Sequence, residues 1–381
     1  MALRSPCRWP RQLPRRSPRQ WGRAAAAALL ACGVAVQAAP LDVLLTATPE
    51  RASPQLRVEL GLDLVNRSID FSTSADPAEQ NPATTEGDYR GGQLLAAWRA
   101  SDRLWLSGGL WQRRISNAVD HFDYTSWQLA GQWRFTDAAG AMPALALRLG
   151  AWGNRASATE ATTPVRVPGA ILDTVSVDSP SDQQLQVDLV ATWPVSARLD
   201  VSAVLSAGRS QLRYGGLTAT TTRNGCPYNL VFNGNDIFGT LAQPCTGTGG
   251  GVIRQFFDSS GDYGVDVARE IAWDGRFLQM GANLRWLQGD WQLAGGYLYH
   301  RMRRSGVDGI LARRGDPVHR HNHVVMAEAA YRVGPQLSVF GRAQVSSNLF
   351  LHDIPVTYNA STSGSFGNRF SLVTLGLRAD F

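Results

Sequence analysis

Three histidines at alternate positions have the spacing that best suits ligand binding. His319, His321 and His323 would share one face of a strand, because successive side chains of a strand point to opposite sides. Imidazoles placed in this way could bind one metal ion. The shared face continues into apolar Val325, so we expect the histidines at a rim. Arginines nearby favour phosphate as the ligand instead; they are Arg313, Arg314 and Arg320.

Two other groupings contain the residue types of hydrolase sites. One is the segment Asp120–Asp123, which includes His121, and the other is His352 with Ser346 or Ser347. A histidine beside an acid or a hydroxyl can serve as a base. Neither grouping matches the spacing of a known motif, and no nucleotide loop, zinc box or flavin fingerprint occurs. We therefore expect no enzyme, and we assign no catalytic residue, no metal ligand and no cofactor.

Segments of alternating polarity surround these residues and predict strands. In the first, Val58, Leu60, Leu62 and Leu64 alternate with polar or small residues. Twelve such segments occur, at 57–64, 89–100, 103–116, 126–135, 143–157, 183–194, 198–207, 275–287, 291–304, 321–333, 336–348 and 368–381. Each can supply the ~9–11 residues with which a strand crosses an outer membrane. No stretch reaches the ~18 apolar residues of a membrane-spanning helix, which argues against a helical inner-membrane protein.

The last segment carries the most specific signal. Val373, Leu375, Leu377 and Ala379 are apolar, mostly polar or small residues fall between them, and the chain ends at Phe381. This pattern resembles the last strand of Gram-negative outer-membrane β-barrels, in which the final Phe is read by the insertion machinery. The resemblance implies an all-β transmembrane antiparallel barrel in the outer membrane of a Gram-negative bacterium. It also implies outer-membrane lipids, lipopolysaccharide and the barrel-assembly machinery as partners, so the rim would face lipopolysaccharide phosphates.

The connections between segments alternate in length. Short ones fall near 101–102, 137–142, 194–196, 288–290 and 334–335, and long ones at about 72–87, 117–123, 158–181, 215–274, 305–319 and 349–366. This is the expected asymmetry of short periplasmic turns and long external loops, and it gives twelve strands. Residues 262–274 also alternate, and we expect them to extend a strand beyond the membrane, with a bulge possible at Gly275. Fourteen strands, one of them hidden in 215–261, is the alternative.

A targeting segment precedes the strands. Seven arginines lead into an apolar run at 24–36, and Val36–Ala38 has the form of a cleavage site. We expect residues 1–39 to be a cleaved signal peptide, 40–54 a short periplasmic extension and 55–381 the barrel. All 37 basic residues are arginines, and without those seven, 30 basic residues face 31 acidic ones. The mature chain is therefore nearly neutral, and its charge does not indicate nucleic-acid binding.

Two cysteines lie in the long loop at about 215–274. Cys226 and Cys245 would be in an oxidising compartment, and we predict that they form a disulfide. A glycine run, Gly247–Gly251, suggests a mobile loop that could enter the barrel or stand outward. We favour a stapled surface loop without a ligand. Residues Leu29–Cys32 loosely resemble a lipoprotein cleavage box, so lipidation of Cys32 is an alternative.

Charged residues at inward positions are predicted to line the lumen: Arg134, Arg148, Arg285, Arg342, Arg378, Glu59, Asp63, Asp188 and Glu328. An arginine-lined passage would attract anions, whereas ion pairs would fill a narrow lumen. Twelve strands lie between the filled and the open sizes. We therefore predict first a porin-like passive pore for small hydrophilic solutes, anions among them. The second hypothesis is a closed barrel whose loops serve adhesion or envelope architecture, and the third is a rim hydrolase.

Overall fold

The computed structural model describes residues 54–65, 88–116, 120–162, 164–167, 170–246, 253–348, 351–367 and 369–381. The expected signal peptide, Cys32 and nearly all of the expected periplasmic extension lie outside the described residues.

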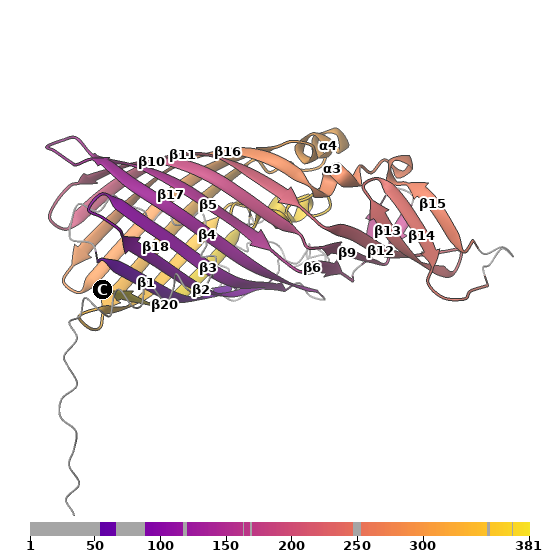
Figure 1. The fold of residues 1–381 in the computed structure, drawn as a ribbon, viewed down its shortest axis with the longest axis horizontal. Helices are drawn as coiled ribbons and strands as arrows, with labels where there is room; N and C mark the ends of the chain where they lie inside the picture. The colour runs from indigo at the N-terminus through magenta and orange to yellow at the C-terminus, as the bar shows by residue number, and fades with distance from the viewer. Residues whose placement is uncertain are drawn as a thin grey trace, which may run out of the picture.

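Twelve antiparallel strands form a closed barrel (Figure 1). In ring order they are β1 (Leu56–Val65), β2 (Asp88–Arg99), β3 (Leu104–Ser116), β4 (His121–Thr136), β5 (Ala144–Arg155), β10 (Ser181–Pro194), β11 (Leu199–Arg213), β16 (Trp273–Gln288), β17 (Trp291–Arg304), β18 (His321–Arg332), β19 (Leu337–Ser346) and β20 (Phe370–Asp380). Each predicted segment coincides with one strand, which confirms the predicted barrel. The ring closes where Leu60 of β1 pairs with Leu377 of β20. Closure is required in lipid because an open sheet edge would leave backbone groups without partners.

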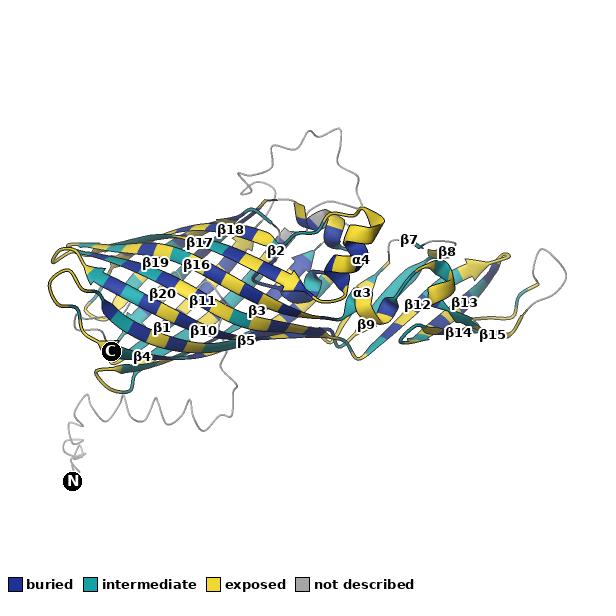
Figure 2. Ribbon diagram, turned by 90° about the horizontal axis from the view of Figure 1, so that it is seen from above, coloured by how far each residue is buried: buried dark blue, intermediate teal, exposed yellow. Residues whose placement is uncertain are grey.

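Buried and exposed residues alternate along the barrel strands (Figure 2). On β20, Leu375 and Leu377 point outward and are exposed, whereas Thr374 and Arg378 point into the lumen and are buried. An apolar exterior around a polar interior is the pattern of a barrel that stands in lipid. Among the described residues, no helix is both long and apolar enough to cross a bilayer.

A second sheet extends beyond the end of the barrel that carries the long connections (Figure 1). We call this end external and the end with the short turns periplasmic, as the sequence leads us to expect. Its strands, in spatial order, are β15 (Gln255–Ser259), β14 (Asp236–Leu241), β13 (Cys226–Asn233), β12 (Gly216–Arg223), β9 (Thr174–Asp178) and β6 (Ala158–Ala161). A separate hairpin contains β7 (Val165–Val167) and β8 (Ala170–Leu172). The long loop predicted at 215–274 therefore stands outward, but four strands structure it. None of them joins the ring, so the fourteen-strand alternative is wrong.

Residues 260–271 contain two short helices and do not extend a barrel strand. Ser260–Tyr263 form the 3₁₀ helix η3, Val267–Ile271 form α3, and β16 begins only at Trp273. Gly275 pairs regularly with Ser210, without the bulge considered above. The predicted projecting strand is wrong because the buried pair of α3, Val267 and Glu270, has the three-residue spacing of a helix face. Short α4 (Val307–Arg314) contacts α3.

The connection between β19 and β20 folds into the lumen. It contains η4 (Pro355–Thr357) and η5 (Ser363–Gly367), and Leu351, Ile354 and Tyr358 are fully buried. Helix η4 contacts β5 and β10, which stand nearly opposite β19 and β20 in the ring. Residues 351–367, which we call the plug loop, therefore cross the lumen near its external end.

Candidate functional site

Four of the predicted lumen charges form one ion-pair network in the periplasmic half of the barrel. Arg378 donates to Glu59 Oε1 and to Glu328 Oε1, both at 2.7 Å. Arg342 donates to Glu328 Oε2 at 2.7 Å and to Glu59 Oε2 at 3.3 Å. Both guanidinium groups also lie over the ring of Phe340, 5.2 and 5.1 Å from its centre. Two acids and two arginines thus neutralise one another on the neighbouring strands β1, β18, β19 and β20.

Two further arginines of the predicted lining are also paired. Arg148 donates to Asp188 at 2.9 Å, and Arg285 donates to Asp200 at 2.7 Å. Both pairs join inward positions of adjacent strands, so the alternation of the strands is enough to bring the partners to the lumen side.

The remaining two predicted lining residues lie at different levels. Asp63 accepts hydrogen bonds from Gln93 at 2.9 Å and from Thr374 at 2.7 Å inside the barrel. Arg134 lies beside a short turn at the periplasmic mouth, where its Nε is 3.1 Å from Asp137 Oδ1. Asp63 therefore belongs to the packed interior, whereas Arg134 is tied to the turn.

The charged side chains of the network and of the Arg148–Asp188 pair are almost inaccessible to water. Arg342 is 8% exposed, Arg378 3% and Asp188 0%. Several polar inward residues are at most 1% exposed, including Ser202, Ser206 and Gln279. In a water-filled channel these groups would be accessible to solvent. The lumen is therefore packed with side chains at this level, and its arginines face carboxylates rather than an aqueous passage.

Two inward glycines make room for aromatic rings in this packing. A Cβ on Gly376 would lie 2.6 Å from the ring of Phe340, and one on Gly208 would lie 2.2 Å from the ring of Phe277. Real Cβ contacts are longer than this, so both positions need the absence of a side chain. The glycines therefore leave room for these two rings against the inner wall.

The plug loop closes the external half of the lumen through hydrogen bonds and ring stacking. The backbone N–H of Val356 donates to Asp182 Oδ2 at 2.8 Å, and Trp273 Nε1 donates to the carbonyl of Tyr358 at 2.9 Å. The guanidinium of Arg304 stacks on the Tyr358 ring at 4.0 Å. These contacts fix the loop to β10, β16 and β17, on the wall away from the strands that it connects.

Apolar packing supports the same loop. Its buried apolar residues lie in one cluster with side chains from the inner wall, namely Tyr89, Ile115, Tyr124, Trp152, Leu212, Trp273, Phe277 and Met302. Fully burying one such side chain contributes about 1.5–3 kcal/mol. Sequence reasoning missed this plug. A usable signal existed, because Leu351, Ile354, Val356 and Tyr358 are too apolar for an external loop that is surrounded by water.

The predicted histidine rim divides into two environments. His321 and His323 lie on the outer face of β18, where His321 Nδ1 and Tyr299 share a hydrogen bond and His323 Nδ1 lies 2.7 Å from the Tyr297 hydroxyl. His319 precedes the strand and is half-buried, so it does not share their face. Among the described residues, no three His, Cys, Asp or Glu side chains are grouped so that they could hold a metal ion.

Two of the three predicted rim arginines are held in ion pairs around α4. Arg314 Nη1 donates to Glu270 Oε2 at 2.8 Å, and Arg320 Nε donates to Asp308 Oδ2 at 3.1 Å. Arg313 is exposed on α4. Two of the three arginines thus form ion pairs that attach α4 to the neighbouring segments.

The two hydrolase-like groupings do not form a nucleophile and base pair in the part of the chain described. Asp123 is paired with Arg114 at 2.7 Å. Ser347 donates to Asn322, and His352 is buried in the plug loop. Burial lowers the pKa of His352, so its imidazole is neutral at neutral pH.

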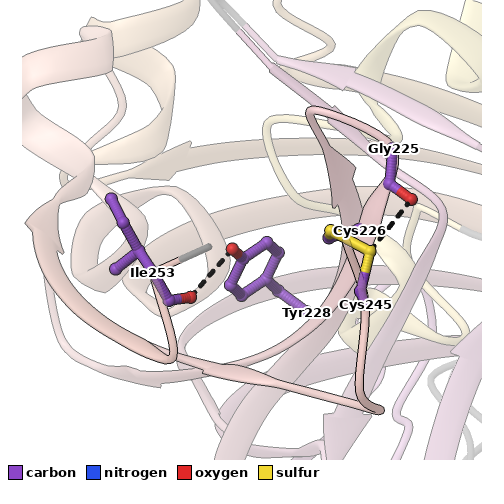
Figure 3. The surroundings of a disulfide bond; sticks show 5 residues. All are labelled: Gly225, Cys226, Tyr228, Cys245 and Ile253. Atoms are coloured by element: carbon purple, nitrogen blue, oxygen red, sulfur yellow. Dashed lines mark hydrogen bonds between the residues drawn. A yellow bond between two sulfur atoms is a disulfide. The ribbon is translucent and has the colours of Figure 1, made fainter. Parts of the chain in front are cut away.

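A disulfide staples the external sheet, as the sequence predicts (Figure 3). It joins Cys226 at the start of β13 to Cys245, which follows β14, with the Cα atoms 5.7 Å apart. Nearby, the Tyr228 hydroxyl donates to the carbonyl of Ile253 at 2.9 Å. The bond and this contact hold the two sides of the segment that follows β14. In the chain-entropy description, closing a loop of this length contributes about 3 kcal/mol.

Comparison with known proteins identifies no family. No protein-family model matches, and no curated protein sequence matches. The solved structures similar to this chain include the translocator domain of the autotransporter NalP from Neisseria meningitidis, with 12% identity over 95% of this chain and 99% of that chain and a TM-score of 0.46. The β domain of the Bordetella autotransporter BrkA has 9% identity, coverages of 86% and 100% and a TM-score of 0.41. The NanC porin has 7% identity, coverages of 86% and 100% and a TM-score of 0.37. Similarities this low say nothing about function.

The chain's own architecture defines its class. A closed ring of twelve antiparallel strands, apolar outside and polar inside, is a β-barrel of the outer-membrane type.

Proposed function

We propose that this protein is a closed outer-membrane barrel that presents its external sheet at the cell surface for adhesion or envelope architecture. This is the second hypothesis from the sequence. The observation that carries it is the low solvent exposure, at most 8%, of the ion-pair network and of the Arg148–Asp188 pair inside the barrel. A passive pore needs a continuous aqueous path, and both the ion-pair network and the plug loop argue against one. We also propose an outer-membrane location, recognition by the barrel-assembly machinery and no enzymatic role.

The external sheet supports the proposal because one of its faces carries exposed apolar side chains. Val231 pairs with Phe238, and Phe238 pairs with Phe257, so the three form a row across β13, β14 and β15. Phe257 is 70% exposed, Val231 51% and Phe238 46%. Neighbouring side chains of this face are polar, such as Asn229 and Asp236. Exposed apolar patches with polar surroundings are typical of interaction surfaces.

Conductance in planar bilayers tests the closed state. The refolded, signal-cleaved protein should leave the membrane current at its baseline between pH 7 and 8. A stable single-channel conductance would overturn the proposal and restore the pore hypothesis.

Adhesion of expressing bacteria tests the display role. Bacteria carrying the wild-type protein should adhere to at least one member of a panel of immobilised glycans and extracellular proteins. The double variant Phe238→Ser/Phe257→Ser should lose that adhesion, whereas Thr218→Ser on the same face should retain it. Equal adhesion of the double variant, with equal surface expression, would contradict a role for this face.

A further inference from the structure

Three arginines form a row on the outer surface of the barrel. Arg209 of β11 pairs with Arg276 of β16, and Arg276 pairs with Arg303 of β17. All three point outward and are exposed. Directly opposed residues of antiparallel strands have Cβ atoms about 4.5–5.5 Å apart, and like charges at such positions are destabilising. Repulsion within the row therefore destabilises the barrel, and a bound anionic ligand would relieve this repulsion.

No carboxylate neutralises this row within the described part of the chain. Arg209, Arg276 and Arg303 form none of the ion pairs found there, in contrast to the lumen arginines. The acidic residue nearest to Arg276 on the same face of β16 is Asp274, and it is already paired with Arg213 at 2.8 Å. A further arginine, Arg301, lies next to Arg303 on the outer face of β17. The arginines thus form an outward patch of uncompensated positive charge.

The position of the patch along the strands points to the kind of anion. Towards the periplasm from Arg276, the outward residues run from Leu278 to Trp286 and are all apolar. The corresponding bands are Leu199–Ala207 below Arg209 and Trp291–Tyr299 below Arg301. Each band is roughly nine residues long, which is the ~9–11 residues that a strand needs to cross the hydrocarbon core. The arginines therefore begin where the hydrocarbon ends on the external side, at the depth of lipid head groups.

Aromatic and imidazole groups continue the patch onto the next strand. Arg301 pairs with His321, and Tyr299 pairs with His323. Tyrosine is favoured at this interfacial level, where its ring lies among lipid tails and its hydroxyl among head groups. Arginine binds phosphate through two parallel hydrogen bonds, which suits a phosphorylated head group better than a diffuse anion.

We propose that Arg209, Arg276 and Arg303, with Arg301 beside them, bind the phosphates of a phosphorylated glycolipid of the outer leaflet. The site differs from the rim expected at Arg313, Arg314 and Arg320, two of which are engaged in ion pairs. It lies on the barrel wall, at the external edge of the apolar band. Its role would be to anchor the barrel at a fixed depth with the external sheet held clear of the membrane. The proposal does not depend on the function of that sheet.

Native mass spectrometry of the full mature protein in detergent tests the site, with bisphosphorylated lipid A as the probe. Wild-type protein should retain the lipid, and the triple variant Arg209→Gln/Arg276→Gln/Arg303→Gln should bind it on the order of 100-fold more weakly. The charge-matched control Arg198→Gln/Arg223→Gln/Arg254→Gln, made at exposed arginines away from the patch, should bind as the wild type does. Heat-modifiable migration in gels verifies that each variant forms the barrel.

Two further measurements distinguish a phosphorylated glycolipid from a free phosphate as the ligand. Lipid A with its phosphates removed should bind as weakly to the wild type as lipid A binds to the triple variant. Millimolar pyrophosphate should fail to displace bound lipid A, because it lacks acyl chains to contact the apolar band. Equal binding by the triple variant, equal binding of the dephosphorylated lipid or full displacement by pyrophosphate would each overturn the proposal.

Discussion

The two halves of the lumen are closed by different chemistry. In the periplasmic half, Glu59, Glu328, Arg342 and Arg378 belong to barrel strands and neutralise one another. In the external half, the plug loop enters from the connection between β19 and β20 and packs through apolar side chains. The four charged residues belong to barrel strands, so they cannot move out of the lumen without disrupting the wall. The plug loop can move without breaking any hydrogen bond between barrel strands. One closure is part of the barrel, and the other is an insert.

Removing the insert should have the largest effect. Replacement of residues 351–367 by a short Gly–Ser linker deletes the buried side chains of Leu351, Ile354, Val356 and Tyr358. Each contributes about 1.5–3 kcal/mol, so the melting temperature should fall more than in any point variant described here. Conductance should nevertheless stay at its baseline, because the periplasmic network remains. An open channel in this variant would show that the network does not close the lumen by itself.

Breaking the periplasmic closure should have the next largest effect. Glu328→Gln leaves two buried arginines with only Glu59, and removing one partner from a buried pair costs about 3–5 kcal/mol. The free energy of unfolding, measured with urea in lipid vesicles, should fall by this amount. Asp380→Asn is the control, because its pair with Arg57 is partly exposed and should contribute less than about 1 kcal/mol. Equal losses in the two variants would mean that the periplasmic half is wet.

A change on the lipid face should have an intermediate effect. Leu377 points outward on β20, and Leu377→Arg should cost about 2–4 kcal/mol if it lies at the middle of the bilayer. Gln211→Arg is the matched control, because Gln211 is outward and exposed near the external end of β11. Thr374 does not serve as a control, since it is buried and donates to Asp63. The same urea titration measures both variants, and a cost at Gln211 equal to that at Leu377 would contradict the depth assignment.

Docking of the plug loop in the external half should weaken at acidic pH, and this should be the smallest of the four effects. Burial lowers the pKa of His352 below its ordinary value of 6.5, although Asp353 opposes this and Arg113 adds to it. A released loop would bind a proton near pH 6.5 while the docked loop would not, so docking is unaffected above that pH and weakens below it. Hydrogen exchange of the amides in 351–367, corrected for intrinsic rates, should accelerate as the pH falls below 6.5. His352→Gln should lack this acceleration, and an unchanged pH response in the variant would exclude His352 as the titrating group.

The positions of the strands, and the side of the wall to which each side chain points, could be predicted from the sequence because alternation is a local pattern. The inward direction of the Arg342 side chain, for example, is fixed by its neighbours on β19 alone. Its partner is not, because Glu59 lies 283 residues away and meets it only once the ring has closed. The place where the plug loop docks is likewise not encoded locally, because Val356 is held by Asp182, 174 residues away. The outward arginine row also depends on the pairing of β11, β16 and β17, which no single segment encodes.

Thiol accessibility inside the barrel tests the closed lumen most directly. Ser206→Cys introduces a thiol on an inward position of β11 that is 1% exposed, while Cys226 and Cys245 are consumed in their disulfide. In protein reconstituted into vesicles, a small water-soluble methanethiosulfonate should leave this thiol unmodified until the barrel is unfolded. Thr218→Cys on the external sheet should react at once and serves as the positive control. Modification of the Ser206→Cys thiol at a rate similar to that of the Thr218→Cys thiol would show a water-filled passage and contradict the closed barrel.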